Sequence, residues 1–252
     1  MITGHPRYPN PTIGEALCEI HFNLPEDVQW DPSFFARFYH RIEEDYPEFE
    51  PAAPVGLQLQ LSSGQVGFIP PQSRVRYKHR SRNALLQLAE NLLTVNVLPR
   101  YEGWTRMQTD VLQAWGWAQE VFRPTGISRV GLRYIDFIPF ENPSETPGDW
   151  LAPNDYVAPA ALTSKAGFLS RVETQESSSR RVIVTVGQPQ SSETKGTEAG
   201  TIVLDMDCIE EGAGGCVQEL EPTLGDLHEL IWTVFSGFVT PRLKRLLEGG
   251  RP

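Results

Sequence analysis

The stretch I-G-E-A-L-C-E-I-H-F-N-L (residues 13–24) alternates small or apolar side chains with mostly polar ones. Successive side chains of a β-strand point to opposite faces, so this period of two predicts a strand with one buried face. A second long strand of the same kind is predicted over residues 127–140. The buried side of the first strand would consist of Ala16, Cys18, Ile20 and Phe22.

Helices and shorter strands are expected on both sides of these two strands. Asp31-Pro32 supplies an N-cap and a first-turn proline for a helix that ends before Pro47. Apolar residues at helical spacing predict two longer helices, over residues 104–122 and from Thr223 onwards. Short strands are expected within residues 55–98 and at residues 167–174, 180–186 and 201–207.

This order of elements repeats along the chain. A strand, a helix, several strands and a helix are followed by a strand, several strands and a helix. Strands grouped between helices, without regular alternation, are typical of an α+β fold with an antiparallel sheet. We therefore expect one α+β domain (residues 1–252) with three main helices and two related halves, 1–125 and 126–252. The proline-rich residues 139–165 and the polar residues 187–200 are expected to be flexible loops.

The composition indicates a soluble protein with a local rather than a general attraction for anions. The formal net charge of -10 argues against coating of nucleic acid, because non-specific affinity depends on phosphate neutralisation. Three cysteines without paired spacing fit a reducing compartment. Neither a secretory leader nor an apolar run long enough for a bilayer is evident. We expect a cytoplasmic protein without a membrane partner.

The segment R-V-R-Y-K-H-R-S-R (residues 74–82) has a cation at every second position. In an extended chain these cations would form one row, with Tyr77 and His79 on the other side. Residues 52–89 contain no Asp or Glu, so the sequence predicts an anion-binding row. Two other interpretations stay open: protection of a sheet edge, and ion pairs with distant carboxylates. The predicted row consists of Arg74, Arg76, Lys78, Arg80 and Arg82.

Two motifs carry a family resemblance. P-N-P-T-I-G-E-A-L-C-E-I-H-F (residues 9–22) and G-I-S-R-V-G-L-R-Y-I-D (residues 126–136) resemble the start and the central strand of a sporadically distributed bacterial family of similar length. Residues 85–96 and 101–104 are similar to that family's hairpin and the helix start after it. The resemblance implies no catalytic residue, and the scattered distribution implies a mobile-element or defence setting.

A second candidate site lies on the two long strands. Glu15 and Glu19 share one strand face, and Arg129 and Arg133 share another. If the strands pair, these four residues form either an ion-pair ladder or the lining of a ligand site. Two amides of the hairpin beside the cationic segment are either further ligand-lining residues or plain turn and edge residues. These amides are Gln87 and Asn96.

The cysteine, histidine and glycine patterns indicate no catalytic thiol, metal site or phosphate-binding loop. Cys18 is expected in the core, whereas Cys208 and Cys216 flank a glycine-rich turn and are expected to be exposed thiols. The five histidines lack metal-ligand spacing, and no phosphate-binding or dinucleotide motif occurs. We therefore predict no metal site and no cofactor.

Two functional hypotheses follow from these features. The first is a non-enzymatic binding or regulatory module whose cationic row contacts a nucleic acid or an acidic protein surface. The second is an enzyme or small-ligand binder for a phosphorylated or carboxylated compound, lined by the Glu/Arg cluster. The first is favoured, an oligomer is compatible with both, and a subunit that works only with a partner is a third possibility.

Overall fold

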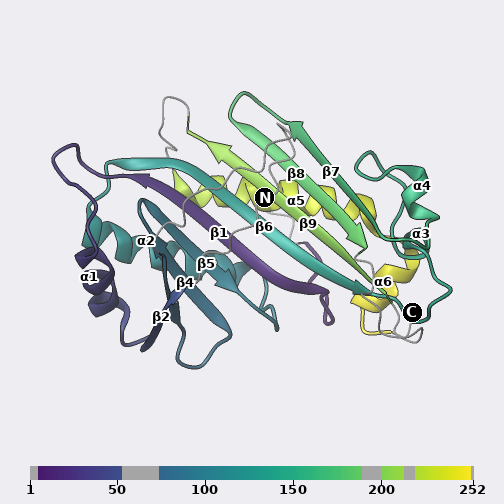
Figure 1. Cartoon of the computed structure of the whole chain (residues 1–252), viewed down its shortest axis with the longest axis horizontal. Helices are drawn as coiled ribbons and strands as arrows, with labels where there is room; N and C mark the ends of the chain where they lie inside the picture. The colour runs from purple at the N-terminus through teal and green to yellow at the C-terminus, as the bar shows by residue number, and fades with distance from the viewer. Residues whose placement is uncertain (1–4, 53–73, 189–199, 213–218, 251–252) are drawn as a thin grey trace.

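The structure, a computed structural model, describes residues 5–52, 74–188, 200–212 and 219–250. Within these residues nine strands form one sheet in the order β2-β3-β4-β5-β1-β6-β9-β8-β7, and every pairing is antiparallel (Figure 1). This confirms the predicted α+β class with an antiparallel sheet. The strands are β1 (Ile13–Asn23), β2 (Glu48–Ala52), β3 (Arg74–Lys78), β4 (Ala84–Ala89), β5 (Leu92–Val97), β6 (Gly126–Pro139), β7 (Phe168–Gln175), β8 (Arg180–Gln188) and β9 (Thr201–Glu211).

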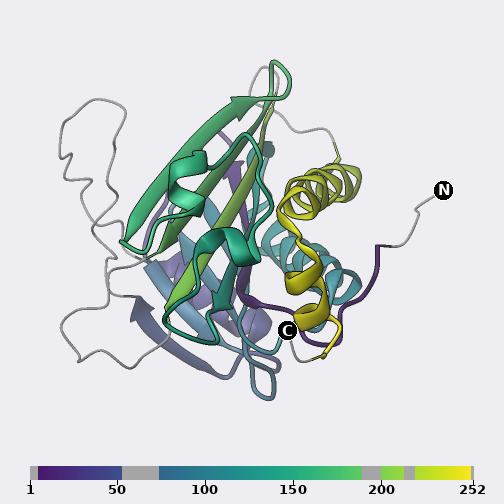
Figure 2. The ribbon, with the colours of Figure 1, turned by 90° about the vertical axis from the view of Figure 1, so that its right-hand side faces the viewer.

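The long helices pack on one face of this sheet. Figure 2 shows α2 and α5 on the same side of the strands, with α6 beside them. The predicted buried row of β1 lies under them, since Ala16, Cys18 and Ile20 are fully buried. The helices are α1 (Ser33–Ile42), α2 (Trp104–Phe122), α3 (Pro147–Trp150), α4 (Pro159–Leu162), α5 (Leu220–Phe238) and α6 (Pro241–Leu247).

The chain follows the same path in both halves of the sheet. In each half the first strand lies at the centre of the sheet and pairs with the last strand of that half, β1 with β5 and β6 with β9. The strand order β3-β4-β5-β1 is therefore followed by β6-β9-β8-β7. A 19-residue helix, α2 or α5, comes directly after the last strand of each half. The pairing of β1 with β6 joins the halves into one sheet.

Two segments differ from the sequence-based prediction. Residues 139–165, expected as an irregular flexible loop, include α3 and α4, because Trp150 is fully buried and its indole N–H donates to Glu145 at 2.9 Å. The short edge strand β2 was not predicted, since its five residues E-F-E-P-A include Pro51, which cannot donate a backbone hydrogen bond to a neighbouring strand. The strands expected near residues 57–61 and most of the 187–200 loop lie outside the described residues.

The face of the sheet opposite the core carries mostly polar side chains, and we call it the polar face. On it Glu19, Thr94, Gln87, Arg76 and Glu50 are successive neighbours across β1, β5, β4, β3 and β2. Residues of both predicted sites lie on this face, near its edge and at its centre. Of the helices described, none is long and apolar enough to cross a membrane.

Candidate anion-binding site

The cationic segment is extended over only part of its length. Strand β3 ends at Lys78, and His79 then begins the turn to β4. The backbone N–H of His79 donates to Ala84 O at 3.0 Å, and the His79 ring Nδ1 accepts the backbone N–H of Ser81 at 3.1 Å. The predicted row of five cations is therefore wrong in its second half, because these bonds bend the chain after Lys78.

Three cations of the segment do share the polar face. Arg76 lies opposite Gln87 and Lys78 opposite Leu85, and Arg74 is two residues before Arg76. Tyr77 points to the other face, where it is fully buried and its hydroxyl donates to Phe35 O at 3.0 Å. The alternation predicted from the sequence thus applies to residues 74–78.

Arg82 has a structural partner instead of a place in the row. Its guanidinium donates to both carboxylate oxygens of Asp110 in α2, at 3.0 and 2.7 Å, and to Glu102 at 2.6 Å. Burial alone would lower the pKa of Arg82, but the hydrogen bonds to Asp110 and Glu102 raise it above its ordinary value. Since Asp110 is only 4% exposed, this pair fixes the β3–β4 turn to α2.

The remaining cations have few carboxylates to neutralise them. Glu50 of β2 accepts from Lys78 at 3.1 Å and from Arg76 at 3.3 Å, and these contacts lower its pKa. Arg80 is exposed, and neither it nor Arg74 forms an ion pair with a described carboxylate. One carboxylate therefore serves two cations, and two more cations have none.

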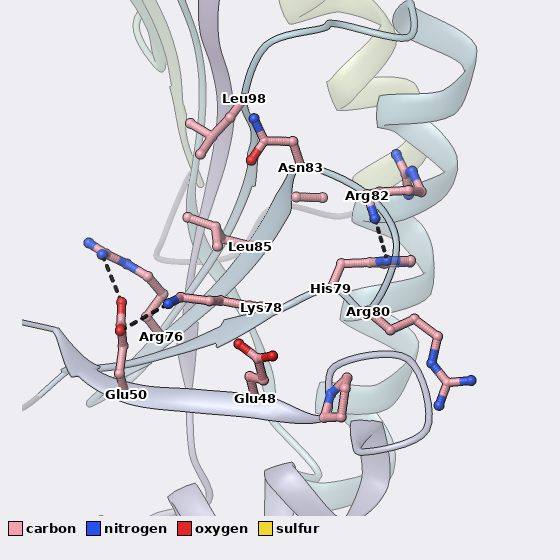
Figure 3. Close-up of a pocket in the computed structure, with 12 residues that line it drawn as sticks. Glu48, Glu50, Arg76, Lys78, His79, Arg80, Arg82, Asn83, Leu85 and Leu98 are labelled. Carbon is pink, nitrogen blue, oxygen red and sulfur yellow. Dashed lines mark hydrogen bonds and ion pairs between the residues drawn. The ribbon is translucent and has the colours of Figure 1, made fainter.

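An open hollow of about 460 Å³ lies at this edge of the sheet, and we call it the edge hollow. Figure 3 shows Arg76 and Lys78 converging on Glu50, whereas the Arg80 side chain extends away from the strands. Pro47, Leu85 and Leu98 form apolar parts of its wall. The charged residues that line it are Glu48, Glu50, Arg76, Lys78, Arg80 and Arg82.

The centre of the polar face contains a chain of hydrogen bonds. Gln87 donates its amide N–H to Asn96 at 2.8 Å, and Asn96 donates to Glu15 at 2.6 Å. The structure therefore brings together these three candidate ligand-lining residues. Each of the three side chains is hydrogen-bonded to its neighbour, and these bonds fix the side chains relative to one another.

The predicted Glu/Arg cluster forms only in part. Arg129 lies 3.6 Å from Glu19 and 2.8 Å from the Nε2 atom of His21. Arg133 turns instead to Asp205 of β9, in a two-pronged contact at 2.7 and 2.6 Å. The ladder expected between β1 and β6 is incomplete because β9, on the other side of β6, supplies the carboxylate that Arg133 contacts.

Asp207 is a residue of this face that the sequence analysis did not select. Its carboxylate makes no hydrogen bond with the described residues, and burial raises its pKa to about 6 despite the nearby Arg133 and Arg129. Arg133 lies opposite Asp207 in the register, and a Cβ added at Gly131, two residues before Arg133, would be 3.7 Å from an Asp207 oxygen. The alternation in T-I-V-L-D-M-D (residues 201–207) could have indicated that Asp205 and Asp207 share the polar face.

The two described thiols, Cys18 and Cys208, are core residues. Cys18 is buried as predicted, and the expectation of an exposed Cys208 is wrong because β9 continues to Glu211 and turns this side chain inwards. Burial raises the pKa of both thiols, which keeps them protonated and unreactive. Cys216 lies outside the described residues.

No protein-family model matches the chain, and no curated protein matches it. The similarity of residues 9–22 and 126–136 to a sporadically distributed family therefore stays a prediction.

Proposed function

We propose that the protein is a non-enzymatic binding module that takes a phosphate group of a nucleic-acid strand into the edge hollow. The observation that carries the proposal is the charge balance there. Arg76, Lys78 and Arg80 line one hollow with two carboxylates, Glu48 and Glu50, and among the described carboxylates only Glu50 forms ion pairs with them.

A phosphate can replace Glu50 as the partner of these cations. Exposed ion pairs contribute little, because water screens them and ordering two long side chains costs entropy. Arg and Lys form charge-assisted hydrogen bonds to phosphate oxygens as well as to carboxylates, and a backbone phosphodiester carries one negative charge, like Glu50. Glu50 would then hold Arg76 and Lys78 in place until the anion arrives.

The size and lining of the edge hollow limit how the ligand binds. A volume of about 460 Å³ is within the range of small-ligand sites and admits a phosphate with its adjoining sugar. Stacking of bases at the edge hollow is not supported, since Tyr77 is buried on the other face and the His79 ring accepts backbone N–H groups. Phosphate contact is therefore the favoured mode.

Fluorescence anisotropy of a labelled single-stranded oligonucleotide tests the proposal. The double variant Arg76→Gln/Lys78→Gln should bind at least about tenfold more weakly, which corresponds to about 1.4 kcal/mol. Arg171→Gln is the matched control, because Arg171 is an exposed arginine of β7 at the far end of the same sheet. Equal affinity of the double variant and the wild type would contradict the proposal.

Competitors identify the source of the phosphate. Displacement by a mononucleotide or inorganic phosphate at concentrations close to those of the oligonucleotide would indicate a small phosphorylated ligand. Displacement by longer strands alone would indicate a nucleic acid. Binding of an acidic peptide, with no binding of any phosphate compound, would overturn the proposal in favour of an acidic protein partner.

Asp207 favours a second candidate, an enzyme acting on a phosphorylated or carboxylated compound. A carboxylate without a hydrogen-bond partner and with a pKa of about 6 is suited to proton transfer near neutral pH. Arg129 and Arg133 lie close enough to attract an anionic substrate. Turnover of p-nitrophenyl phosphate that is lost in Asp207→Asn but retained in Arg76→Gln/Lys78→Gln would select this candidate, and equal turnover by Asp207→Asn and the wild type would contradict it.

A further inference from the structure

Three potential metal ligands meet on the helix side of the molecule, away from the polar face. His5 belongs to the segment before β1, and His228 and Glu229 belong to α5. The Nε2 atom of His5 lies 2.8 Å from a carboxylate oxygen of Glu229. One ligand atom from each of the three residues lies within 4.8 Å of the other two.

Aromatic side chains hold both imidazoles. The His228 ring stacks on Trp104 of α2, with centroids 4.0 Å apart and planes 9° from parallel. The His5 ring stacks on Trp232, one turn further along α5, at 4.5 Å. Their own centroids are 5.6 Å apart. Stacking restricts both rings, so the ligand atoms, which already lie within 4.8 Å of one another, have little freedom left to lose.

His228 has no other polar role within the described residues. Its ring makes stacking contacts there but no hydrogen bond, although it is half-buried. A half-buried ring nitrogen without a hydrogen-bond partner is otherwise unfavourable.

We propose that His5, His228 and Glu229 bind a divalent transition-metal ion of the zinc type. Two imidazoles and one carboxylate are a ligand set that suits Zn²⁺ and leaves a fourth position for water. Bond lengths near 2.0–2.2 Å place ligand atoms about 3.3 Å apart in a tetrahedral site. The cluster would therefore contract by about 1.5 Å at most, with His5 as the ligand outside any helix.

This proposal departs from the sequence-based expectation of no metal site. His5 and Glu229 are 224 positions apart, so no local spacing could have indicated the cluster. Binding would attach the segment before β1 to α5 through a metal ion as well as through ring stacking. The proposal is independent of the phosphate site, since no residue is shared.

Isothermal titration of the metal-free full chain with Zn²⁺ tests the proposal. We expect one ion per chain, and affinity at least about tenfold lower in His5→Ala, His228→Phe and Glu229→Gln. His228→Phe keeps an aromatic ring against Trp104, so it removes the ligand while preserving the stacking. His40→Ala is the matched control, because His40 is a histidine of α1 whose side chain is 74% exposed.

Thermal unfolding provides the second readout. Zn²⁺ should raise the melting temperature of the wild type and of His40→Ala, and should leave that of His228→Phe unchanged. Absence of Zn²⁺ binding to the wild type, or equal binding by the wild type and all three ligand variants, would overturn the proposal.

Discussion

The chain follows the same path in the two halves of the sheet, but the arginines of the halves differ in how they pair with carboxylates. In the C-terminal half, Arg133 pairs with Asp205, and Arg180 pairs with Glu210 and Asp226. At the edge of the N-terminal half, Arg76 must share Glu50 with Lys78, and Arg80 pairs with no described carboxylate. Cations already matched to carboxylates stabilise the fold, whereas cations in excess are free to bind a ligand.

Arg82 provides the largest test of this comparison, because it is a matched cation inside the cationic segment. Arg82→Ala would leave Asp110, 4% exposed, with Arg106 as its remaining ion-pair partner. Removing one partner of a buried charge is destabilising, and Arg106 compensates for Asp110 only in part, so we expect the free energy of unfolding to fall by about 2 kcal/mol. Chemical denaturation of the wild type and of Arg82→Ala measures this difference in the free energy of unfolding.

Arg80→Ala is the control within the same turn. Arg80 is exposed and lacks an ion pair with any described carboxylate, so the change in stability should stay within about 0.5 kcal/mol. Similar losses for Arg82→Ala and Arg80→Ala would show that matched and unmatched cations do not differ as described.

The pH dependence of stability tests the centre of the polar face. The pKa of Asp207 is about 6 in the folded protein, above its ordinary 3.8, so folding favours the protonated form. Below the pKa of the unfolded state, protonated Asp207 does not lower the stability of the folded protein. As the pH rises through 6 this advantage of the protonated form is lost, which lowers the free energy of unfolding by about 2–3 kcal/mol at pH 7. Asp207→Asn should therefore be more stable than the wild type at pH 7 and nearly equal to it near pH 3.5.

Unfolding by urea at these two pH values measures the difference. A wild type that is favoured over Asp207→Asn at pH 7 would mean that the nearby arginines stabilise the charged form, which would reverse the assigned direction of the pKa shift.

A smaller effect is expected at Glu50, where removal of one carboxylate should strengthen ligand binding. Glu50→Gln frees both Arg76 and Lys78, so affinity for the oligonucleotide should rise severalfold while stability changes little. Competitive anisotropy compares it with Glu48→Gln, an exposed neighbour in the same hollow that forms no ion pair with described residues. Weaker binding by Glu50→Gln would show that this carboxylate contributes to recognition itself.

The sequence predicted the strands and helices better than it predicted which distant groups their side chains contact. Alternation located β1 and β6, and helical spacing located α2, because apolar periodicity depends on local geometry. The turn at His79 could not be predicted in this way, since it depends on hydrogen bonds to Ala84 and Asp45. Likewise, Asp205 and Asp110 neutralise Arg133 and Arg82 from elements far away in the sequence.

The salt dependence of binding tests most directly the claim that the edge hollow holds cations in excess. For single strands, the logarithm of the affinity falls with the logarithm of salt concentration by about 0.7 per phosphate neutralised. If Arg76, Lys78 and Arg80 each neutralise one phosphate of the strand, we expect a slope of about -2 for the wild type and about -1.4 for Arg80→Gln. A slope near zero in the wild type, or an unchanged slope in Arg80→Gln, would contradict the account.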